Sequence, residues 1–310
     1  MGAPRIAIAP EPAADWVRQA IEEGGGDVVP LAESEGLVWT APRGADELRS
    51  LLGSGPRIRW VQLPWAGVEE FARLGVFDDD GSGRQWTCGK GVYAEPVAEH
   101  ALALALAGLR SLPERVRATS WGAQAGVSLY DARVTILGAG GITECLVDLL
   151  RPMRTEVTVV RRDASTPFPG ALRTVGLADL HDALPGADIV FLALALTPGT
   201  VGVIGSGELA RMEPHAWLVN VARGRHVDTH ALVAALRNGV IGGAGLDVTE
   251  PEPLPDDHPL WALPNVIITP HTANTQEMAR PLLGARITEN VRRFAAGEEL
   301  IGPVDGSLGY

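Results

Sequence analysis

Cysteine is scarce in this chain, with only Cys88 and Cys145 among 310 residues. A chain of this length does not need disulfides to fold, and the sequence has no C-x-x-C pair or Cys/His cluster of the kind that binds metal ions. We therefore expect free thiols and no metal site.

Positive charge and long apolar runs are also in short supply. The chain has 26 basic against 38 acidic residues, a net charge of -12, which makes nucleic acid and anionic membrane surfaces poor partners. The longest apolar runs, such as ALALALAGL at residues 101–109, are far shorter than a membrane span. The first residues lack the basic-then-apolar layout of a signal peptide. We expect a soluble, cytoplasmic protein that binds neither nucleic acid nor membranes.

The chain instead shows an alternation of short apolar runs and helical patterns. RIAIA, DVV, LVW and IRWVQL are typical of strands in the first third, and residues 13–23 of a helix. A long helical pattern near Glu95 has no turn residue until Gly108, and a second series follows as VTIL, EVTVV, DIVFLAL, AWLVNV, GAGLDV and VIITP. The last segment is amphipathic and helical, with Pro281 tolerable only near a first turn or a kink. This rhythm predicts two α/β units with parallel sheets.

A glycine turn opens the second series, in RVTILGAGGITECLVDLL at residues 133–150. In a G-x-G-x-x-G fingerprint the first glycine allows a tight turn, the second lets the backbone approach a pyrophosphate, and the third lets helix and strand pack closely. Gly138 and Gly140 are present, but Thr143 stands in the third position. Three interpretations are open: a working dinucleotide site, a weakened dinucleotide site, or an ordinary strand-turn-helix that binds no nucleotide. Because the third position has a steric role, we expect Thr143 to be tolerated and the helix N-terminus to bind the anion.

Two arginines follow the next strand. A dinucleotide site usually carries Asp or Glu there, about 20 residues after the glycines, to accept hydrogen bonds from the ribose 2'-OH. This chain has Arg161 and Arg162 instead. Arginine removes a repulsive carboxylate and offers a planar donor fork to a 2'-phosphate. The pattern favours NADP(H) and leaves NAD(H) open; the alternative is two surface arginines.

Several blocks of the sequence resemble the D-isomer-specific 2-hydroxyacid dehydrogenase family: GVYAEPVAEHALAL, the GAGGI turn, LTPGTVGVIG, and the stretch from LVNVARG to ITPHTAN. They span about residues 91–274, and the first ninety residues match only loosely, chiefly through WVQLPWAGVEE. The resemblance implies two Rossmann-like domains with parallel sheets. These are a flavodoxin-like substrate domain of residues 1–94 and 276–310, and an NAD(P)-binding Rossmann domain of residues 95–275. It also implies a homodimer joined through the latter domain, where the ALALALAGL helix could bury an apolar face.

The resemblance implies a catalytic trio. Arg223 comes from N-V-A-R-G, Glu252 lies five residues after Asp247, and His271 belongs to the P-H pair after the last strand. Arg223 would hold a 2-oxo acid by its carboxylate and carbonyl oxygens, a bidentate task that lysine does poorly. His271 would donate a proton to the carbonyl oxygen, and Glu252 would orient the imidazole and raise its pKa. Glu250 competes for the acidic role, but the spacing from Asp247 favours Glu252.

The same resemblance assigns binding residues. Cofactor contacts are expected at Gly138, Ala139, Gly140, Gly141, Ile142, Arg161, Arg162, Leu196, Thr197, Thr200, Val221, Ala222 and Asp247. Substrate contacts are expected at Trp65, Ala66, Gly67, Val68, Arg223 and His271, with the substrate carboxylate on the backbone N–H groups of residues 66–68. Ala195 departs from the proline often found before Leu196 in the family.

Some residues keep two interpretations. Trp65 and Trp261 would narrow the substrate pocket, or would only pack in a core or interface. His100 is expected to serve packing, and the other histidines outside the trio to lie at the surface or in loops: His181, His215, His226, His230 and His258.

These observations predict an NAD(P)-dependent 2-hydroxyacid dehydrogenase that works as a reductase of a small 2-oxo acid, such as glyoxylate or hydroxypyruvate. The alternative from another class is a catalytically idle NAD(P)H-sensing binding protein, like the transcriptional corepressors that share this fold. The presence of arginine, glutamate and histidine together favours the enzyme.

Overall fold

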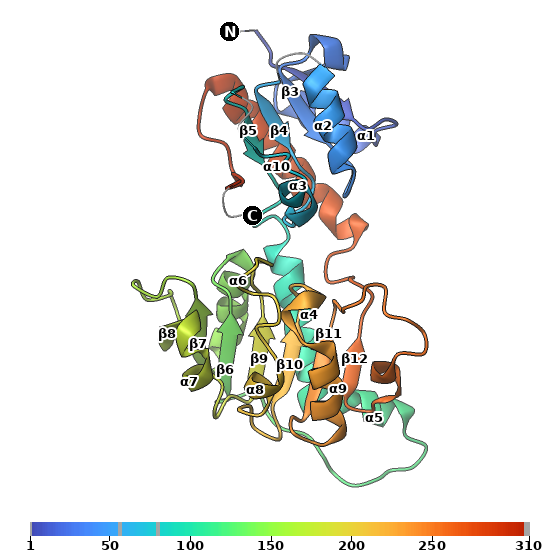
Figure 1. The fold of residues 1–310 in the computed structure, drawn as a ribbon, viewed down its shortest axis with the longest axis vertical. Helices are drawn as coiled ribbons and strands as arrows, with labels where there is room; N and C mark the ends of the chain where they lie inside the picture. Colours follow the sequence, from blue (N-terminus) through green and yellow to red (C-terminus); the bar gives the residue numbers. More distant parts are fainter. Residues whose placement is uncertain (1, 55–57, 79–80, 307–310) are drawn as a thin grey trace. The chain divides into compact units, whose positions relative to one another are not determined.

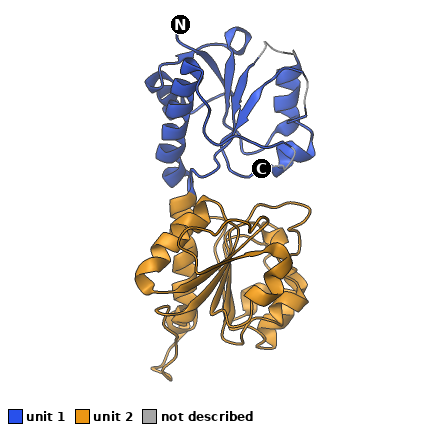
Figure 2. Ribbon diagram, turned by 90° about the vertical axis from the view of Figure 1, so that its left-hand side faces the viewer, with its two compact units in different colours: residues 1–93, 275–310 blue, residues 94–274 orange. Residues whose placement is uncertain are grey.

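The computed structural model describes residues 2–54, 58–78 and 81–306. The chain divides into two compact units, shown in two colours in Figure 2. Unit 1 comprises Met1–Tyr93 and Thr275–Tyr310, and unit 2 comprises Ala94–Asn274. Within the described ranges both cysteines are free, and no helix is both long and apolar enough to cross a membrane.

Unit 1 is built on a parallel five-stranded sheet in the order β2-β1-β3-β4-β5. Its strands are β1 (Arg5–Ala9), β2 (Asp27–Val28), β3 (Gly36–Trp39), β4 (Trp60–Gln62) and β5 (Gln85–Thr87). Its helices are α1 (Asp15–Glu23), α2 (Ala45–Ser54), α3 (Glu69–Arg73) and α10 (Gln276–Ala296). This strand order is that of flavodoxin-like folds, as the sequence predicted.

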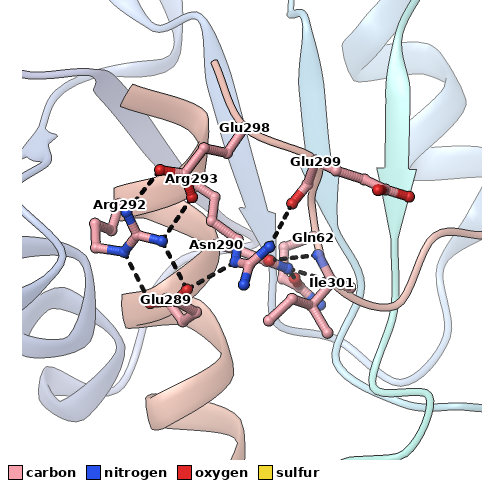
Figure 3. A network of polar contacts seen from close by, with 8 residues as sticks. All are labelled: Gln62, Glu289, Asn290, Arg292, Arg293, Glu298, Glu299 and Ile301. Atoms are coloured by element: carbon pink, nitrogen blue, oxygen red, sulfur yellow. Dashed lines mark hydrogen bonds and ion pairs between the residues drawn. The ribbon is translucent and has the colours of Figure 1, made fainter. Parts of the chain in front are cut away.

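The two chain ends meet in the core of unit 1. Helix α10 packs beside α1 (Figure 1), and Phe294 of α10 lies against the Trp60 ring with centroids 5.3 Å apart. Asn290, fully buried on α10, donates to Gln62 Oε1 at 2.9 Å and exchanges two hydrogen bonds with the backbone of Ile301 (Figure 3). The C-terminal helix is therefore fastened to the N-terminal sheet by apolar and polar contacts.

Unit 2 is built on a parallel seven-stranded sheet in the order β12-β11-β10-β9-β6-β7-β8. Its strands are β6 (Arg133–Leu137), β7 (Glu156–Arg161), β8 (Arg173–Gly176), β9 (Ile189–Leu192), β10 (Trp217–Asn220), β11 (Gly243–Leu246) and β12 (Val266–Ile268). Its α-helices are α4 (Ala94–Leu109), α5 (Leu112–Arg117), α6 (Gly141–Leu150), α7 (Leu180–Ala183), α8 (Ser206–Leu209) and α9 (Thr229–Arg237). From β6 the order reads 3-2-1-4-5-6 with one added strand, which is the Rossmann order.

Helices cover both faces of the unit 2 sheet (Figure 2). Successive strand residues point to opposite faces, so Ile189 and Phe191 join the cluster that includes α4 and α6. Val190 and Leu192 join the cluster that includes α7, α8 and α9. Strands buried on both faces read as continuous apolar runs, which explains why DIVFLAL and its neighbours were recognisable.

Two strands and one helix detail differ from the predictions. β5 and β8 are edge strands whose sequences, QWT and RTVG, contain no apolar run, and so they were missed. The edge strands β2 and β12 were predicted, because DVV and VIITP are largely apolar. Helix α4 ends at Leu109, one residue past the first turn residue of the pattern, Gly108, at which a Cβ would lie 2.3 Å from the Trp217 ring. Pro281 lies in the second turn of α10, past the first turn near which it was expected.

Candidate active site

The turn after β6 requires glycine at its first position. Gly138 has a φ of +116°, and a Cβ on it would lie 2.1 Å from the carbonyl oxygen of Ala193. Its backbone N–H donates to Val160 O at 2.8 Å. The chain itself therefore explains Gly138, without any ligand.

Gly140 differs from Gly138. It precedes α6 with an ordinary φ of -102°, it is exposed, and a Cβ built on it would meet no atom within 4 Å. Nothing in the chain requires glycine there, whereas a pyrophosphate approaching the backbone would. The first N–H groups of α6 have no partner within the helix and carry its positive dipole. The turn therefore fits the pyrophosphate of a dinucleotide.

Thr143 is compatible with this turn. It is fully buried, and its hydroxyl donates to the carbonyl oxygen of Gly138 at 3.0 Å. The residue in the third glycine position thus bonds the first turn of α6 to the glycine turn.

Arg161 is the last residue of β7 and is half-buried, and Arg162 is exposed. Asp163 follows them and accepts a hydrogen bond from Ser165 N at 2.9 Å. Its pKa lies below the usual value, because of the Ser165 hydrogen bonds first and the two arginine charges last. The end of β7 therefore carries two arginine cations. The carboxylate next to them, Asp163, is hydrogen-bonded within its own loop.

The loop after β9 contains three of the expected cofactor residues. Thr200 holds it together, since its hydroxyl donates to Ala195 O and accepts from Thr197 N, each at 2.8 Å. The His226 imidazole supports this loop, since its Nδ1 lies 2.9 Å from Thr200 O and its Nε2 lies 3.2 Å from Leu194 O. His226 was predicted to lie at the surface or in a loop. It does not lie at the surface, because its ring is fully buried where it makes these contacts.

Arg223 follows β10 in a segment shaped by Asn220, a buried residue that the sequence did not single out. The Asn220 side chain donates to Arg223 O at 2.9 Å and accepts from Ala222 N at 3.0 Å. The Arg223 guanidinium donates to Ala222 O at 2.7 Å. Gly224 must be glycine, because a Cβ would lie 1.9 Å from Thr249 O.

His271 and Glu252 form a pair. Nδ1 of His271 lies 2.7 Å from Glu252 Oε1, so Glu252 is the acid that contacts the imidazole. The hydrogen bond to Glu252 raises the pKa of His271 above its ordinary value, against the effects of burial and of the Arg223 charge. The same bond lowers the pKa of Glu252. The side chain of His271 remains about half exposed, so a protonated imidazole can meet a ligand.

Asp247 holds the loop that carries His271. It is buried and accepts hydrogen bonds from Thr269 Oγ1 at 2.6 Å, Thr272 N at 2.8 Å and Ala273 N at 3.0 Å. Burial alone would raise the pKa of Asp247, but hydrogen bonds from His100 and from this loop outweigh it and lower the pKa. The loop backbone is unusual, since His271 has a φ of +50°, and such conformations gather at functional sites.

His100 takes part in this network. Its Nε2 lies 2.9 Å from Thr269 Oγ1 and 3.4 Å from Asp247 Oδ1. His100 therefore has a structural role, as expected, but through polar contacts that join α4 to the loop of His271. In the sequence the one sign of this is a histidine at the start of the apolar part of the helix.

The expected substrate loop lies in unit 1. The Trp65 ring packs on Tyr93 with centroids 5.3 Å apart, and the Tyr93 hydroxyl donates to Pro64 O at 2.6 Å. The N–H groups of Ala66–Val68 form no hydrogen bond with any described residue. Trp261 lies in unit 2, where its indole N–H donates to Pro255 O at 2.9 Å.

Residues 100–273, more than half of the chain, match the family model described as the NAD binding domain of D-isomer specific 2-hydroxyacid dehydrogenases. The chain belongs to this family. It is an oxidoreductase that acts on the CH–OH group of its donors with a nicotinamide cofactor.

Individual relatives are similar to this chain over most of its length. An uncharacterized protein in the proB 3' region of Corynebacterium melassecola is 40% identical over 82% of this chain and 84% of its own length. A glyoxylate reductase of Aeropyrum pernix is 34% identical over 80% of this chain and 76% of its own. The structure of a D-isomer specific 2-hydroxyacid dehydrogenase from Xanthobacter autotrophicus, in complex with NADPH and MES, covers both chains completely with a TM-score of 0.84 and 28% identity.

Proposed function

We propose that this enzyme is an NADPH-dependent reductase of small 2-oxo acids of the glyoxylate and hydroxypyruvate class. The observation that carries the proposal is the His271–Glu252 pair: a half-exposed imidazole whose pKa is raised by a carboxylate 2.7 Å away. Such an imidazole is a proton donor near neutral pH. The names of relatives, glyoxylate reductase and glyoxylate/hydroxypyruvate reductase, support the substrate class.

In the proposed reaction His271 donates the proton on Nε2 to the carbonyl oxygen of the 2-oxo acid. Glu252 holds Nδ1–H and stabilises the imidazolium until the proton leaves. Arg223 binds the carboxylate and the carbonyl oxygen through its two-pronged guanidinium. Reduced nicotinamide, when bound, supplies the hydride to C2. The product is the 2-hydroxy acid, and His271 acts as the base in the reverse direction.

We assign the substrate carboxylate to the N–H groups of Ala66–Val68. Three successive donors without a partner in the described residues suit a carboxylate. Asp247, the glycine turn and the loop at residues 196–200 are assigned to the cofactor, as are Val221 and Ala222 after β10.

We assign the cofactor preference to Arg161 and Arg162, whose cations stand where a 2'-phosphate would be bound. The complex of the Xanthobacter relative with NADPH supports this choice, and NAD(H) is the second candidate. Arg161→Ala is expected to raise the KM for NADPH about tenfold while changing the KM for NADH little. Arg173→Ala, at an exposed arginine on the neighbouring strand, is the control. An unchanged KM for NADPH in Arg161→Ala contradicts the assignment.

We also propose a homodimer. Helix α4 packs within unit 2 against α6, β10 and β11, and its Leu102 and Leu106 remain only partly buried. Between residues 112 and 130 five large apolar side chains are 45–96% exposed: Leu112, Val116, Trp121, Val127 and Tyr130. Apolar side chains left exposed in either segment are candidates for a dimer interface. Analytical ultracentrifugation at micromolar concentration tests this, and a monomer there contradicts it. The cytoplasmic location stays a prediction.

A further inference from the structure

Unit 1 contains a pocket of about 290 Å³ that the proposed chemistry does not use. Its lining residues lie at or just after the carboxyl ends of β1, β3 and β4, in the first turn of α1 and in the first half of α10. In open parallel sheets, ligands bind outside the carboxyl ends of the strands. The pocket therefore occupies the position in unit 1 where this kind of fold binds ligands.

The walls of the pocket are mostly apolar. Twelve of the sixteen lining residues are apolar, and three of these are the tryptophans Trp16, Trp39 and Trp65. Two of the polar residues are already bonded within the chain. Thr40 Oγ1 donates to Ala9 O at 3.3 Å, and Gln62 uses Nε2 on Leu63 O and Oε1 as an acceptor. The larger part of the pocket surface is therefore aromatic and aliphatic.

The volume suits a ring. A cavity of about 150 Å³ with apolar walls is enough to bind benzene, and this pocket is nearly twice as large. The C3 methyl group of pyruvate or the hydrogen on C2 of glyoxylate would leave it mostly empty.

The pocket is continuous with the loop assigned to the substrate carboxylate. Pro64 and Trp65 line it and directly precede Ala66–Val68 in the chain. A 2-oxo acid held by those N–H groups thus has the pocket beside it. Building on the proposed function, we propose that the pocket binds the C3 substituent of the substrate. The enzyme then reduces, besides glyoxylate and hydroxypyruvate, 2-oxo acids with an apolar, ring-sized side chain, for which phenylpyruvate is the probe.

Among the described residues, Arg280 is the one charged residue that lines the pocket. It is exposed and forms no hydrogen bond or ion pair with any described residue. Its guanidinium at the rim can lie over the face of an aromatic ring. A second substrate carboxylate on Arg280 is the competing occupant, but placing that charge among three tryptophans is costly.

The test is a set of kcat/KM values with NADPH for glyoxylate, pyruvate, phenylpyruvate and 2-oxoglutarate. We expect phenylpyruvate to exceed pyruvate by about tenfold or more, because apolar groups in a fitting pocket contribute at this level. Ala14→Trp fills the pocket from an exposed position at the start of α1 that makes no capping hydrogen bond. It is expected to lower the ratio of phenylpyruvate to glyoxylate kcat/KM about tenfold. Arg18→Trp, exposed on the same helix and outside the pocket, is expected to leave that ratio unchanged.

The outcomes separate this inference from the function on which it rests. Turnover of glyoxylate with no preference for phenylpyruvate over pyruvate overturns the inference and leaves the proposed function standing. A preference for 2-oxoglutarate that Arg280→Met abolishes overturns it in favour of an anionic side chain. If no 2-oxo acid is turned over, the proposed function fails, and calorimetric titration with 3-phenyllactate decides the pocket. Binding that Ala14→Trp weakens supports the inference, and no binding to the unmodified protein overturns it.

Discussion

The carboxylate of Glu252 governs the proton on His271. Glu252→Gln keeps an acceptor for Nδ1–H but removes the charge that raises the pKa of His271. Reduction needs the protonated imidazole, so its rate falls as the pH rises through the pKa of His271. With that pKa lowered, the alkaline limb of the kcat/KM profile for reduction is expected to move to lower pH, as is the acidic limb for oxidation. Glu250→Gln is the matched control, and a profile that moves equally in both variants contradicts the pairing.

Thr143 shows how a motif can depart from its pattern and keep its structure. Thr143→Val preserves the shape of this buried side chain but removes its hydrogen bond to Gly138 O. The loss is expected to cost about 1 kcal/mol, or a Tm lower by about 2–4 °C, and to weaken NADPH binding because the glycine turn is held less firmly. Thr143→Ser keeps the hydroxyl and serves as the control in thermal unfolding and NADPH titration. A Thr143→Val protein with unchanged Tm and affinity contradicts this role.

The contact of Glu252 with His271 could be predicted because both residues belong to motifs that are continuous in the sequence. His100, Asn220 and His226 could not, because each acts on a partner that only the fold brings near. His100 meets Thr269, 169 positions away, and His226 meets Leu194 and Thr200. A lone histidine in a sequence carries no sign of such a partner.

The turn between β6 and α6 contains two glycines, and each is explained by a different physical reason. Gly138→Ala is expected to destabilise the fold by more than about 2 kcal/mol, since φ is +116° and the Cβ would lie 2.1 Å from a carbonyl oxygen. Gly140→Ala is expected to change stability by less than about 0.5 kcal/mol but to weaken NADPH binding at least tenfold. Thermal unfolding and fluorescence titration of NADPH measure both. A Gly140→Ala protein that binds NADPH normally means that no cofactor approaches this backbone.

Helix α4 supports the loop after β12 through His100. His100→Leu removes the contact with Thr269 and is expected to lower kcat about fivefold, the effect of losing about one hydrogen bond, and to shift the pH profile of kcat as the His271 loop loosens. His100→Gln, which keeps a polar group, should restore part of kcat. His230→Leu, at an exposed histidine, controls for general effects. If His100→Leu changes only the Tm, His100 has a structural role and no positioning role.

At the level of elements, the sequence predicted the central strands and the two edge strands β2 and β12, and it missed the edge strands β5 and β8. Runs such as VTIL and DIVFLAL are buried on both faces, which leaves a continuous apolar pattern. β5 and β8 have one paired side and mixed exposure, so nothing distinguishes them from loops. The unit 1 pocket could not be predicted from the sequence either, because its walls come from several separate segments between Pro12 and Ile287.

The stability of unit 1 depends on the packing of the C-terminal helix α10 against the N-terminal sheet. Asn290→Leu keeps the volume but leaves the backbone N–H and C=O of Ile301 without their buried partner and removes one of the two donors to Gln62 Oε1. We expect a loss of about 3 kcal/mol, seen by calorimetry as a lower melting temperature for the transition of unit 1. Ala285→Gln, at an exposed position of the same helix, is the control and should melt like the unmodified protein. Equal melting of both variants contradicts the account.

The central claim is that this molecule reduces a 2-oxo acid by proton transfer from His271. The most direct measurement follows the loss of NADPH and NADH absorbance with glyoxylate and hydroxypyruvate, for the unmodified protein and for His271→Gln, with NADPH affinity measured on both. The account predicts turnover with NADPH that falls about a hundredfold or more in His271→Gln, while NADPH binds both proteins alike. NADPH binding without turnover of either 2-oxo acid, or turnover that His271→Gln leaves intact, would contradict it.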